Sequence, residues 1–401
     1  KSTMLQKDYI TNILGIANIS ADKIERNREG VHIYISTKQS VHVCPCCGQK
    51  TKYIHDYRTQ KIKDLNLYGE HCYLMLRKRR YVCGNCGKRF YEKYDFLPKY
   101  SHFSQRVYLS ILKAMERKAS CKDIAAEHNV SSATVLRIFS LRCFTARPQL
   151  PEVLGIDEFK GNTDGEKYNC VITDITNSTV LDILPSRKKD KLLTYFRKYT
   201  KEERSKVKVF VCDMWKDYRD ISALFPNAIL VTDKYHWVRQ AIWAVENVRK
   251  RVQKTFPANK RLHFKRNKYI LLAPREKLGI EDGIVLEYML NQNTDLYNAW
   301  QLKELFYKFK DSASYDEAAE RLKEFILYAE REKIKEFDNC LKALHNWSAP
   351  ILNSFKYKYT NAFTEGMNNN IKVLKRIAYG YRNFDNFRRR ILCIYSNGKA
   401  A

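Results

Sequence analysis

The chain of 401 residues has little of what usually loosens or breaks a fold, since it contains only 14 glycines and 9 prolines. This scarcity argues against a collagen-like or disordered protein and leaves little room for low-complexity linkers. Long apolar runs are also missing: the longest are short stretches such as Tyr269–Ala273, so we expect no membrane-spanning segment. Because Lys1–Met4 show no apolar signal segment, we expect a cytoplasmic protein.

Acidic residues are scarce beside basic ones, with 44 Asp and Glu against 73 Lys and Arg, which gives a formal net charge of +29. Like charges oppose compaction, so folding alone does not require this excess. A large anionic partner is the natural reason for it. The composition therefore favours binding to nucleic acid, or to an acidic membrane surface.

Two C-x-x-C pairs, each followed by glycine, stand out among the 12 cysteines. This spacing lets two thiolates bind one ion from a tight turn, and two such turns supply the four sulfur ligands of a closed zinc site. The sequence predicts one structural Zn²⁺ at Cys44, Cys47, Cys83 and Cys86, with a β-hairpin between the pairs. Cys46 stays open as an alternative to Cys47, and two unrelated turns with buried thiols are the alternative to zinc.

Basic residues cluster beside these cysteines at Arg77–Arg80 and Lys88–Arg89. In a zinc module such a face usually meets phosphates, so we predict that Arg79 and Arg80 contact nucleic acid. A solvated face without a partner is the alternative.

A helical segment at Ser104–Arg117 is followed by a short Ala-rich helix, a small turn and a helix with a Ser-rich start. This order is typical of a helix-turn-helix DNA-binding domain, although a three-helix bundle without DNA could share it. A serine would cap the recognition helix, and polar residues beyond it would face the groove. These residues are Ser131 or Ser132 at the cap, and Thr134 and Arg137 at the groove.

Three carboxylates stand out in this basic chain. Asp157 follows an apolar segment and is expected to end its strand, Asp213 ends another, and Glu365 lies at the start of a basic helix. A strand, an antiparallel pair and a second strand ending in Asp follow the order of an RNase H-like core. Such cores gather two Asp and a helix-borne acid around two Mg²⁺ or Mn²⁺ ions, which prefer carboxylate oxygens. A single strand-end Asp would more often be a turn residue, but three in this order predict catalytic acids and metal ligands.

Further motifs resemble the ISL-three family of bacterial insertion-sequence transposases. The middle of that family is matched by Asp213-Met214, Tyr218, Phe225–Ala228 and Val231–His236, and its C-terminal signature by Thr364–Asn369, Ile371-Lys372, Lys375-Arg376 and Ala378–Gly380. The resemblance spans nearly the whole chain. It implies a DDE transposase with an RNase H-like fold, in which Asp157, Asp213 and Glu365 match the catalytic acids.

The 152 positions from Asp213 to Glu365 are more than one strand and one helix need, and they resemble the all-helical insertion of several DDE transposase groups. Asp233 and His236 match a D-x-x-H pair of such groups. We expect a structural role for the pair, in which Asp233 holds the His236 ring by a hydrogen bond. Trp347 is expected in the core, although an aromatic near the insertion can stack on an unpaired base in related groups.

The chain is thus expected to be a multidomain α+β protein with an RNase H-like core that a helical insertion interrupts. The predicted parts are an N-terminal segment at 1–40, a zinc-binding module at 41–95, a helix-turn-helix domain at 100–147, the first part of the core at 152–240, the helical insertion at 241–345 and the last part of the core at 346–401.

The resemblance implies that the protein cleaves the ends of a mobile element and joins the freed 3′-OH to target DNA. Lys372, Lys375 and Arg376 follow the acid at offsets of 7, 10 and 11, which keeps them near one helical face that suits phosphates. The expected partner is double-stranded DNA in the bacterial nucleoid, bound by at least a homodimer. A non-enzymatic regulator derived from a transposase, and a nuclease of RNA hybrids, remain the rival interpretations.

Overall fold

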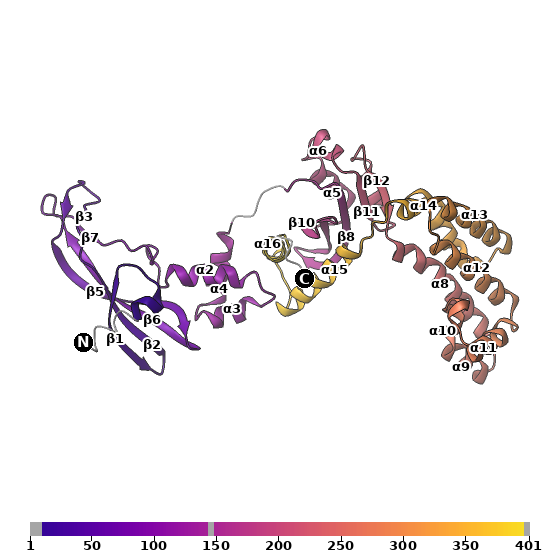
Figure 1. Cartoon of the computed structure of the whole chain (residues 1–401), viewed down its shortest axis with the longest axis horizontal. Coiled ribbons are helices and arrows are strands. Elements are labelled where there is room, and N and C mark those ends of the chain that lie inside the picture. Colours follow the sequence, from indigo (N-terminus) through magenta and orange to yellow (C-terminus); the bar gives the residue numbers. More distant parts are fainter. Residues whose placement is uncertain (1–9, 143–147, 397–401) are drawn as a thin grey trace. The chain divides into compact units, whose positions relative to one another are not determined.

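The computed structural model describes residues 10–142 and 148–396. Their contacts divide the chain into two compact units, one of residues 1–144 with 376–380 and one of residues 145–375 with 381–401. Figure 1 shows the elements of both units along the sequence. Among the described residues, no helix combines the length and the apolar character that crossing a membrane requires.

A five-stranded sheet forms the first part of the first unit. Its strands are β1 (Ile19–Asn27), β2 (Gly30–Thr37), β5 (Ile54–Leu67), β6 (Glu70–Val82) and β7 (Arg89–Tyr91). The order is β1-β2-β6-β5, with β7 on β6, and only the β2–β6 pair is parallel. The predicted hairpin between the cysteine pairs is therefore present as β5–β6, and the short β3 (His42–Val43) and β4 (Lys50–Thr51) lie next to the first pair.

Gly30 shows why the turn between β1 and β2 needs glycine. Its φ of 131° is unfavourable for other residues, and an added Cβ would lie 2.1 Å from the carbonyl oxygen of His71 on β6. The close approach lets β2 pair with β6, and one face of the sheet then buries a core that includes Leu14, Ile33 and Leu74.

Three short helices follow the sheet: α2 (Gln105–Ala114), α3 (Cys121–Glu127) and α4 (Ser132–Ser140). Each begins at a serine whose side chain accepts a backbone N–H of the first turn, at Ser104, Ser120 and Ser131. Ser131, rather than Ser132, is thus the cap of α4. Residues 143–147 of the predicted helix-turn-helix domain lie outside the described residues.

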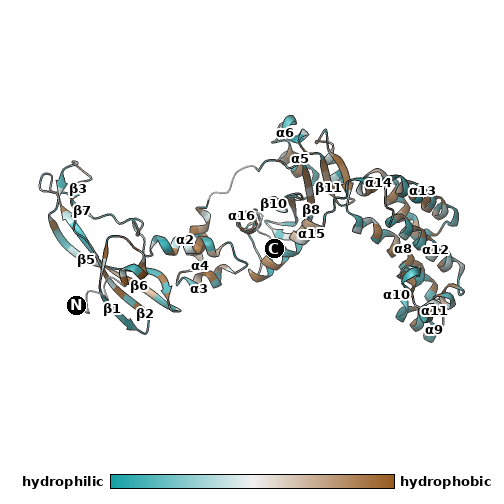
Figure 2. Ribbon diagram, viewed as in Figure 1, coloured by the Kyte–Doolittle hydropathy of each residue, from teal (hydrophilic) through white to brown (hydrophobic). Residues whose placement is uncertain are grey.

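The second unit is built on another five-stranded sheet, with β8 (Val153–Thr163), β9 (Glu166–Asp174), β10 (Thr179–Leu184), β11 (Val209–Cys212) and β12 (Ile229–Thr232). Its order is β10-β9-β8-β11-β12, antiparallel up to β8 and parallel from β8 to β12. The hydropathy colours of Figure 2 show the apolar character of β11, which is buried throughout.

The expectation that β8 ends at Asp157 is wrong. The strand continues to Thr163, because Asp157 and the residues after it pair with β9 as one long hairpin. Asp157 therefore lies within the strand, whereas Asp213 directly follows β11 as expected.

Helices cover both faces of this sheet. On one face α5 (Lys189–Phe196), α6 (Lys201–Ser205) and α7 (Lys216–Ser222) follow one another in sequence, and residues of α5 and α7 share a buried cluster with Leu154, Ile156 and Phe210. Side chains in a strand alternate between faces, so Asp157 and Phe159 point the other way. There they meet α15 (Ala362–Ile377) and α16 (Phe384–Tyr395).

A helical region lies between β12 and α15. It consists of α8 (Lys234–Gln253), α9 (Ala258–Arg266), α10 (Lys268–Leu272), α11 (Ile280–Leu290), α12 (Thr294–Lys310), α13 (Tyr315–Glu332) and α14 (Asp338–Tyr357). Trp237, Phe306, Phe325 and Leu344 belong to its core. The helices start before and end after the range 241–345 expected for the insertion.

Trp347 lies at a kink in α14, where its φ of −122° interrupts the helix. Pro350 lies three residues later and has no N–H to donate back into the preceding turn, which accounts for the bend. The Trp347 side chain is only 6% exposed and belongs to the helical core. This burial favours the expected core role over stacking on a base.

Candidate active site and metal centre

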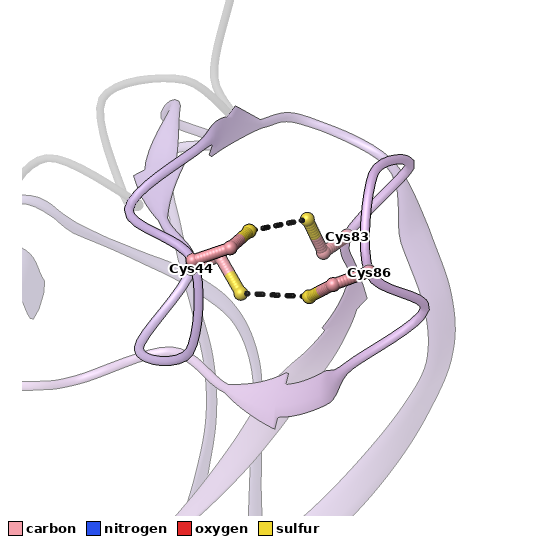
Figure 3. Close-up of side chains that lie close together, drawn as sticks. Cys44, Cys83 and Cys86 are labelled. Carbon is pink, nitrogen blue, oxygen red and sulfur yellow. Dashed lines mark hydrogen bonds between the residues drawn. The ribbon is translucent and has the colours of Figure 1, made fainter.

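The four predicted cysteines form one cluster in the first unit. The sulfurs of Cys44 and Cys86 lie 3.6 Å apart, those of Cys47 and Cys83 lie 3.5 Å apart, and all four lie within 4.8 Å of one another. Figure 3 shows sulfurs from the two loops pointing toward one another. Cys46 is exposed and lies outside this cluster, so the ligand set contains Cys47.

The geometry of the cluster fits a zinc ion. Four sulfurs about 2.3 Å from a central ion lie about 3.8 Å apart in a tetrahedron, close to the two sulfur–sulfur distances. Matching backbone bonds shape the two loops, from Gly48 N–H to the Cys44 carbonyl at 3.0 Å and from Gly87 N–H to the Cys83 carbonyl at 2.9 Å. The backbone N–H of Gln49, and then the thiol of Cys86, lower the pKa of Cys47 to about 6, which favours the thiolate that binds metal.

Arg79 does not have the environment expected of a DNA contact. It is 9% exposed, and its guanidinium lies 3.2 Å from the Glu92 carboxylate and donates to the Thr37 hydroxyl at 2.9 Å. A buried guanidinium paired in this way connects β6 to its neighbours in the sheet. The pairing favours a structural role for Arg79 over the predicted contact with nucleic acid. Arg80 is partly exposed and reaches Asp56 only at 3.5 Å.

Asp157 lies at the centre of the second unit, where it is 7% exposed. One carboxylate oxygen accepts the backbone N–H of Glu158 at 2.7 Å, and the other accepts the Asn368 side-chain amide at 2.6 Å. Glu158 itself points to the opposite face, where Arg187 lies 2.7 Å away and the Tyr218 hydroxyl donates at 3.0 Å. The adjacent acids therefore have different roles, and only Asp157 faces α15.

His236 connects the other two acids. Its Nε2 lies 3.1 Å from an Asp213 carboxylate oxygen and 3.3 Å from a Glu365 carboxylate oxygen. Asp213 comes from the end of β11, His236 from the first turn of α8, and Glu365 from the first turn of α15. The three elements thus meet at the edge of the sheet where its parallel strands end.

Asp233 does not hold the His236 ring as predicted. Its carboxylate oxygens accept the N–H of Tyr235 at 2.9 Å and the N–H of Asn361 at 2.8 Å, so it caps α8 and ties the start of α15 to that cap. Asp233 therefore has a structural role, but its partners are backbone N–H groups and not the His236 ring. His236 contacts the acids instead, and its ligand nitrogen lies within 4.8 Å of oxygens of Asp233 and Glu365.

Close packing fixes α15 against the sheet. An added Cβ on Gly155 would lie 2.4 Å from the Thr173 hydroxyl and 2.8 Å from the Thr364 hydroxyl, so only glycine permits this approach. The two threonine hydroxyls hydrogen-bond each other at 2.8 Å. This packing positions Glu365, the next residue of the helix.

The electrostatics of the acids are unfavourable to full ionisation. Burial first, and then the charge of Asp213, raise the pKa of Asp157 to about 8. Burial first, and then the charges of Glu158, Asp233 and Glu365, raise the pKa of Asp213 to about 7. The second Asp213 oxygen is buried and has no hydrogen-bond partner among the described residues.

The structure thus brings Asp213 and Glu365 onto one histidine and places Asp157 close enough to Asp213 to shift its pKa. Across the described ranges, the three acids do not form a single ligand group within 4.8 Å. Sequence reasoning missed the contact of Asn368 with Asp157, although Asn368 belongs to the C-terminal motif Thr364–Asn369. Asp157 and Asp213 are buried carboxylates that repel each other when ionised, and hard divalent cations prefer such carboxylate oxygens as ligands.

Comparisons with known proteins decide the family. Residues 154–391 match the DDE transposase family named after ISL3, and residues 40–86 match the zinc-finger of transposase IS204/IS1001/IS1096/IS1165. The chain belongs to the ISL3 family of DDE transposases. It is 23% identical, over 96% of its own length and 97% of the relative's, to the transposase for insertion sequence element IS1001 of Bordetella parapertussis.

A shorter match has no bearing on function. It is 39% identical over 61 residues to an ATP-dependent protease of Lactococcus lactis subsp. lactis, and it covers 15% of this chain and 20% of that protein. The family match, in contrast, includes Asp157, Asp213 and Glu365, and the zinc-finger match includes all four clustered cysteines. As a DDE transposase, the protein is a phosphoryl-transfer enzyme.

The remaining residues that the sequence assigned to DNA lie on two helices of this transposase. On α4, Arg137 is exposed and Thr134 is half-buried, and the side chain of the exposed Ser131 accepts the Thr134 N–H as the cap of the helix. On α15, Lys372 and Arg376 are exposed, while Lys375 is half-buried and donates to the Lys160 carbonyl at 3.2 Å. None of these residues except Lys375 has a described contact with the acid site or β8.

Proposed function

We propose that this transposase binds the terminal inverted repeats of an insertion sequence, cleaves the DNA strand there and transfers the freed 3′-OH to target DNA. Asp157, Asp213 and Glu365 are the catalytic acids in this proposal. The observation that carries it is the contact of both Asp213 and Glu365 with His236, together with the position of Asp157 on β8, close enough to Asp213 for that charge to raise the Asp157 pKa.

An RNase H-like fold of the core is part of the proposal. The order β10-β9-β8-β11-β12, with three antiparallel strands followed by two parallel ones, supports it. So does the position of the acids, since one lies on the central strand and one follows its parallel neighbour. The helical region between β12 and α15 is then an insertion into that core.

Two divalent ions, Mg²⁺ or Mn²⁺, fit the donors of the acid site. A cation would stabilise the ionised forms of Asp157 and Asp213, because both carboxylates have raised pKa values. It would also give a partner to the buried Asp213 oxygen that has none among the described residues. Asp157 and Asp213 would hold both ions, and Glu365 would complete one of them. When bound, the ions supply charge stabilisation to the attacking and leaving oxygens of the phosphodiester.

The residues of the chain orient the DNA around these acids. Lys372, Lys375 and Arg376 follow Glu365 on α15 and would contact phosphates beside the scissile bond. Packing through Gly155 and Thr364 holds Glu365 in place during the reaction. No nucleophilic side chain is needed, because water and then the 3′-OH attack phosphorus.

Recognition of the element ends is assigned to the first unit. Four thiolates leave no open position on zinc, so the Cys44, Cys47, Cys83 and Cys86 site is structural. Arg80 would contact phosphates beside it. Helix α4 would enter the major groove, with Ser131, Ser132 and Thr134 near its start and Arg137 reading base edges.

Synapsis of two element ends requires at least a homodimer on DNA, in the bacterial nucleoid. A regulator without enzymatic activity is disfavoured because all three acids are present in the family's core. A nuclease of RNA hybrids would not need two modules that recognise specific DNA ends.

A cleavage assay tests the proposal. Wild-type protein and Mg²⁺ are incubated with labelled DNA of the element's own ends, with random DNA and with an RNA–DNA hybrid. We expect cleavage at the element end alone, its loss in Asp157→Asn, Asp213→Asn and Glu365→Gln, and unchanged end binding in all three. The exposed Asp316, in the first turn of α13, supplies the control Asp316→Asn, which should cleave like the wild type. Retained cleavage in an acid variant would remove that residue from the site.

A further inference from the structure

Asn368 is a buried polar residue in the second unit with no role in the function assigned so far. It lies on α15, one helical turn after Glu365, and its side chain is 5% exposed. Residues three apart on a helix share a face, so Asn368 meets β8 on the same side that brings Glu365 to the acid site.

The contacts of Asn368 fix the orientation of its amide. The side-chain nitrogen donates to the Asp157 carboxylate at 2.6 Å and to the Glu158 carbonyl at 3.2 Å. The Glu158 carbonyl can only accept, so the nitrogen of the amide, and not its oxygen, must face it. The amide oxygen is left buried and has no hydrogen-bond partner among the described residues.

These contacts are not needed to fasten the helix. Helix α15 is already held by the Thr173–Thr364 hydroxyl pair and by the close approach at Gly155. A buried amide with an unpaired oxygen is a costly way to add packing, because an apolar side chain would fill the space without that loss. The bond to Asp157 is a feature that an apolar side chain could not provide.

That bond acts on the orientation of the acid. One Asp157 oxygen is held by the Glu158 N–H at 2.7 Å and the other by Asn368, so the plane of the carboxylate is set from both sides. Partners that hydrogen-bond a metal-binding carboxylate orient it and tune its affinity.

We propose that Asn368 is the positioning residue for Asp157 and that it acts on cation binding through that carboxylate. The inference rests on the proposed role of Asp157 as a metal ligand. Asn368 and Lys372 are the first and last residues of an N–x–x–x–K segment in the C-terminal motif. In this proposal Asn368 orients the Asp157 carboxylate, and Lys372 contacts DNA.

Binding of Mn²⁺ to the full-length, zinc-loaded protein tests this, measured by electron paramagnetic resonance without DNA. We expect Asn368→Ala to bind Mn²⁺ about tenfold more weakly than wild type. Asn369→Ala is the matched control, because Asn369 is the next residue of α15, is exposed and accepts a hydrogen bond from Lys372 at 3.4 Å. It should bind Mn²⁺ like the wild type. Asn368→Leu, which is close in volume and has no donor, replaces Asn368→Ala if the latter does not fold.

A double-mutant cycle separates the possible outcomes. In an Asp157→Ala background, Asn368→Ala should cause no further loss of Mn²⁺ affinity, since the residue acts through Asp157. If Asn368→Ala binds Mn²⁺ with wild-type affinity and has only a lower melting temperature, Asn368 contributes to stability alone. That result would overturn the inference. An equal loss in both backgrounds would also overturn it. If Asp157→Ala alone leaves the affinity unchanged, the assignment of Asp157 in the proposed function fails instead.

Discussion

At the scale of single residues, the acid site holds two buried carboxylates whose charges oppose each other. Asp157 and Asp213 have pKa values raised to about 8 and about 7, first by burial and then by neighbouring negative charges. An ordinary Asp in the unfolded chain has a pKa of about 3.9. Folding without a cation therefore favours the protonated forms of both groups.

This difference predicts how stability depends on pH. Because the folded pKa values are raised, the stabilisation is fully present below about pH 4 and is lost as pH rises through the folded pKa values. The melting temperature of the metal-free protein should therefore fall between about pH 4 and about pH 8, because ionisation of these two acids destabilises the folded state. Mg²⁺ should restore more stability at pH 8.5 than at pH 6, because the cation binds the deprotonated carboxylates.

Thermal unfolding of wild type and Asp157→Asn, with and without Mg²⁺, measures this contribution. Asn cannot ionise, so the variant should lose part of both the pH dependence and the Mg²⁺ effect. A Mg²⁺ stabilisation that is equal at the two pH values, or that the variant retains in full, would contradict the electrostatic account.

The sequence identified the three acids because apolar segments and family motifs are local signals. It could not identify the partners of these acids. Arg79 lies in a basic run, but Glu92, 13 residues away, meets it only in the folded sheet. His236 was expected to bond its neighbour Asp233, yet the backbone N–H of Asn361 takes that carboxylate. Contacts over such separations depend on the tertiary structure.

At the scale of elements, the two cysteine loops explain why one sulfur of a Cys-Cys doublet is a ligand. Each loop closes with a positive-φ glycine directly after the second cysteine of its pair, at Gly48 and Gly87. This closure directs Cys44 and Cys47 to one side and leaves Cys46 exposed. The C-x-x-C spacing predicted the cluster, and the geometry of the turn explains why Cys47 rather than Cys46 belongs to it.

Cys47→Ser should therefore lose zinc, whereas Cys46→Ser should keep it. A hydroxyl is a poor replacement for a thiolate ligand, and the variant would keep only three of the four clustered sulfurs. Zinc content by atomic emission, together with binding to element-end DNA, measures both effects. If Cys46→Ser loses zinc while Cys47→Ser retains it, the ligand assignment moves to Cys46.

The ends of elements were less predictable than their existence. Helix periodicity located α2, α3 and α4, and the serine cap of α4 was expected because capping is a local effect. Strand β8 was placed too short, since its extension depends on pairing with β9. The helices extend beyond the range 241–345 that was expected for the insertion: α8 starts directly at the Asp233 cap, and α14 continues through Pro350 with a kink.

At the scale of the whole molecule, sequence recognition and catalysis are assigned to different parts of the chain. Arg137 lies on α4, whereas Lys375 lies on the helix of Glu365. A contact to a base edge contributes roughly 1–3 kcal/mol of discrimination. A phosphate contact instead strengthens binding to all sequences and adds about one to the slope of affinity against salt.

Arg137→Ala should thus reduce the preference for the terminal repeat over random DNA by about 1–3 kcal/mol. Lys375→Ala should leave that preference intact, lower the salt slope by about one and slow cleavage, because the scissile phosphate is held less well. Competition binding at several salt concentrations, beside cleavage rates, measures these quantities. Equal weakening of repeat and random DNA by Arg137→Ala would move sequence reading to another surface.

The central claim is that the acids at the sheet edge hold the cations of strand cleavage, and a metal-specificity swap at Asp213 tests it most directly. A thiolate is a poor ligand for Mg²⁺ but is accepted more readily by Mn²⁺. Asp213→Cys should bind element-end DNA, fail to cleave it with Mg²⁺ and regain cleavage with Mn²⁺, while Asp213→Asn stays inactive with both. Cleavage by Asp213→Cys at the wild-type rate in Mg²⁺, or none in Mn²⁺ despite intact folding and DNA binding, would contradict the account.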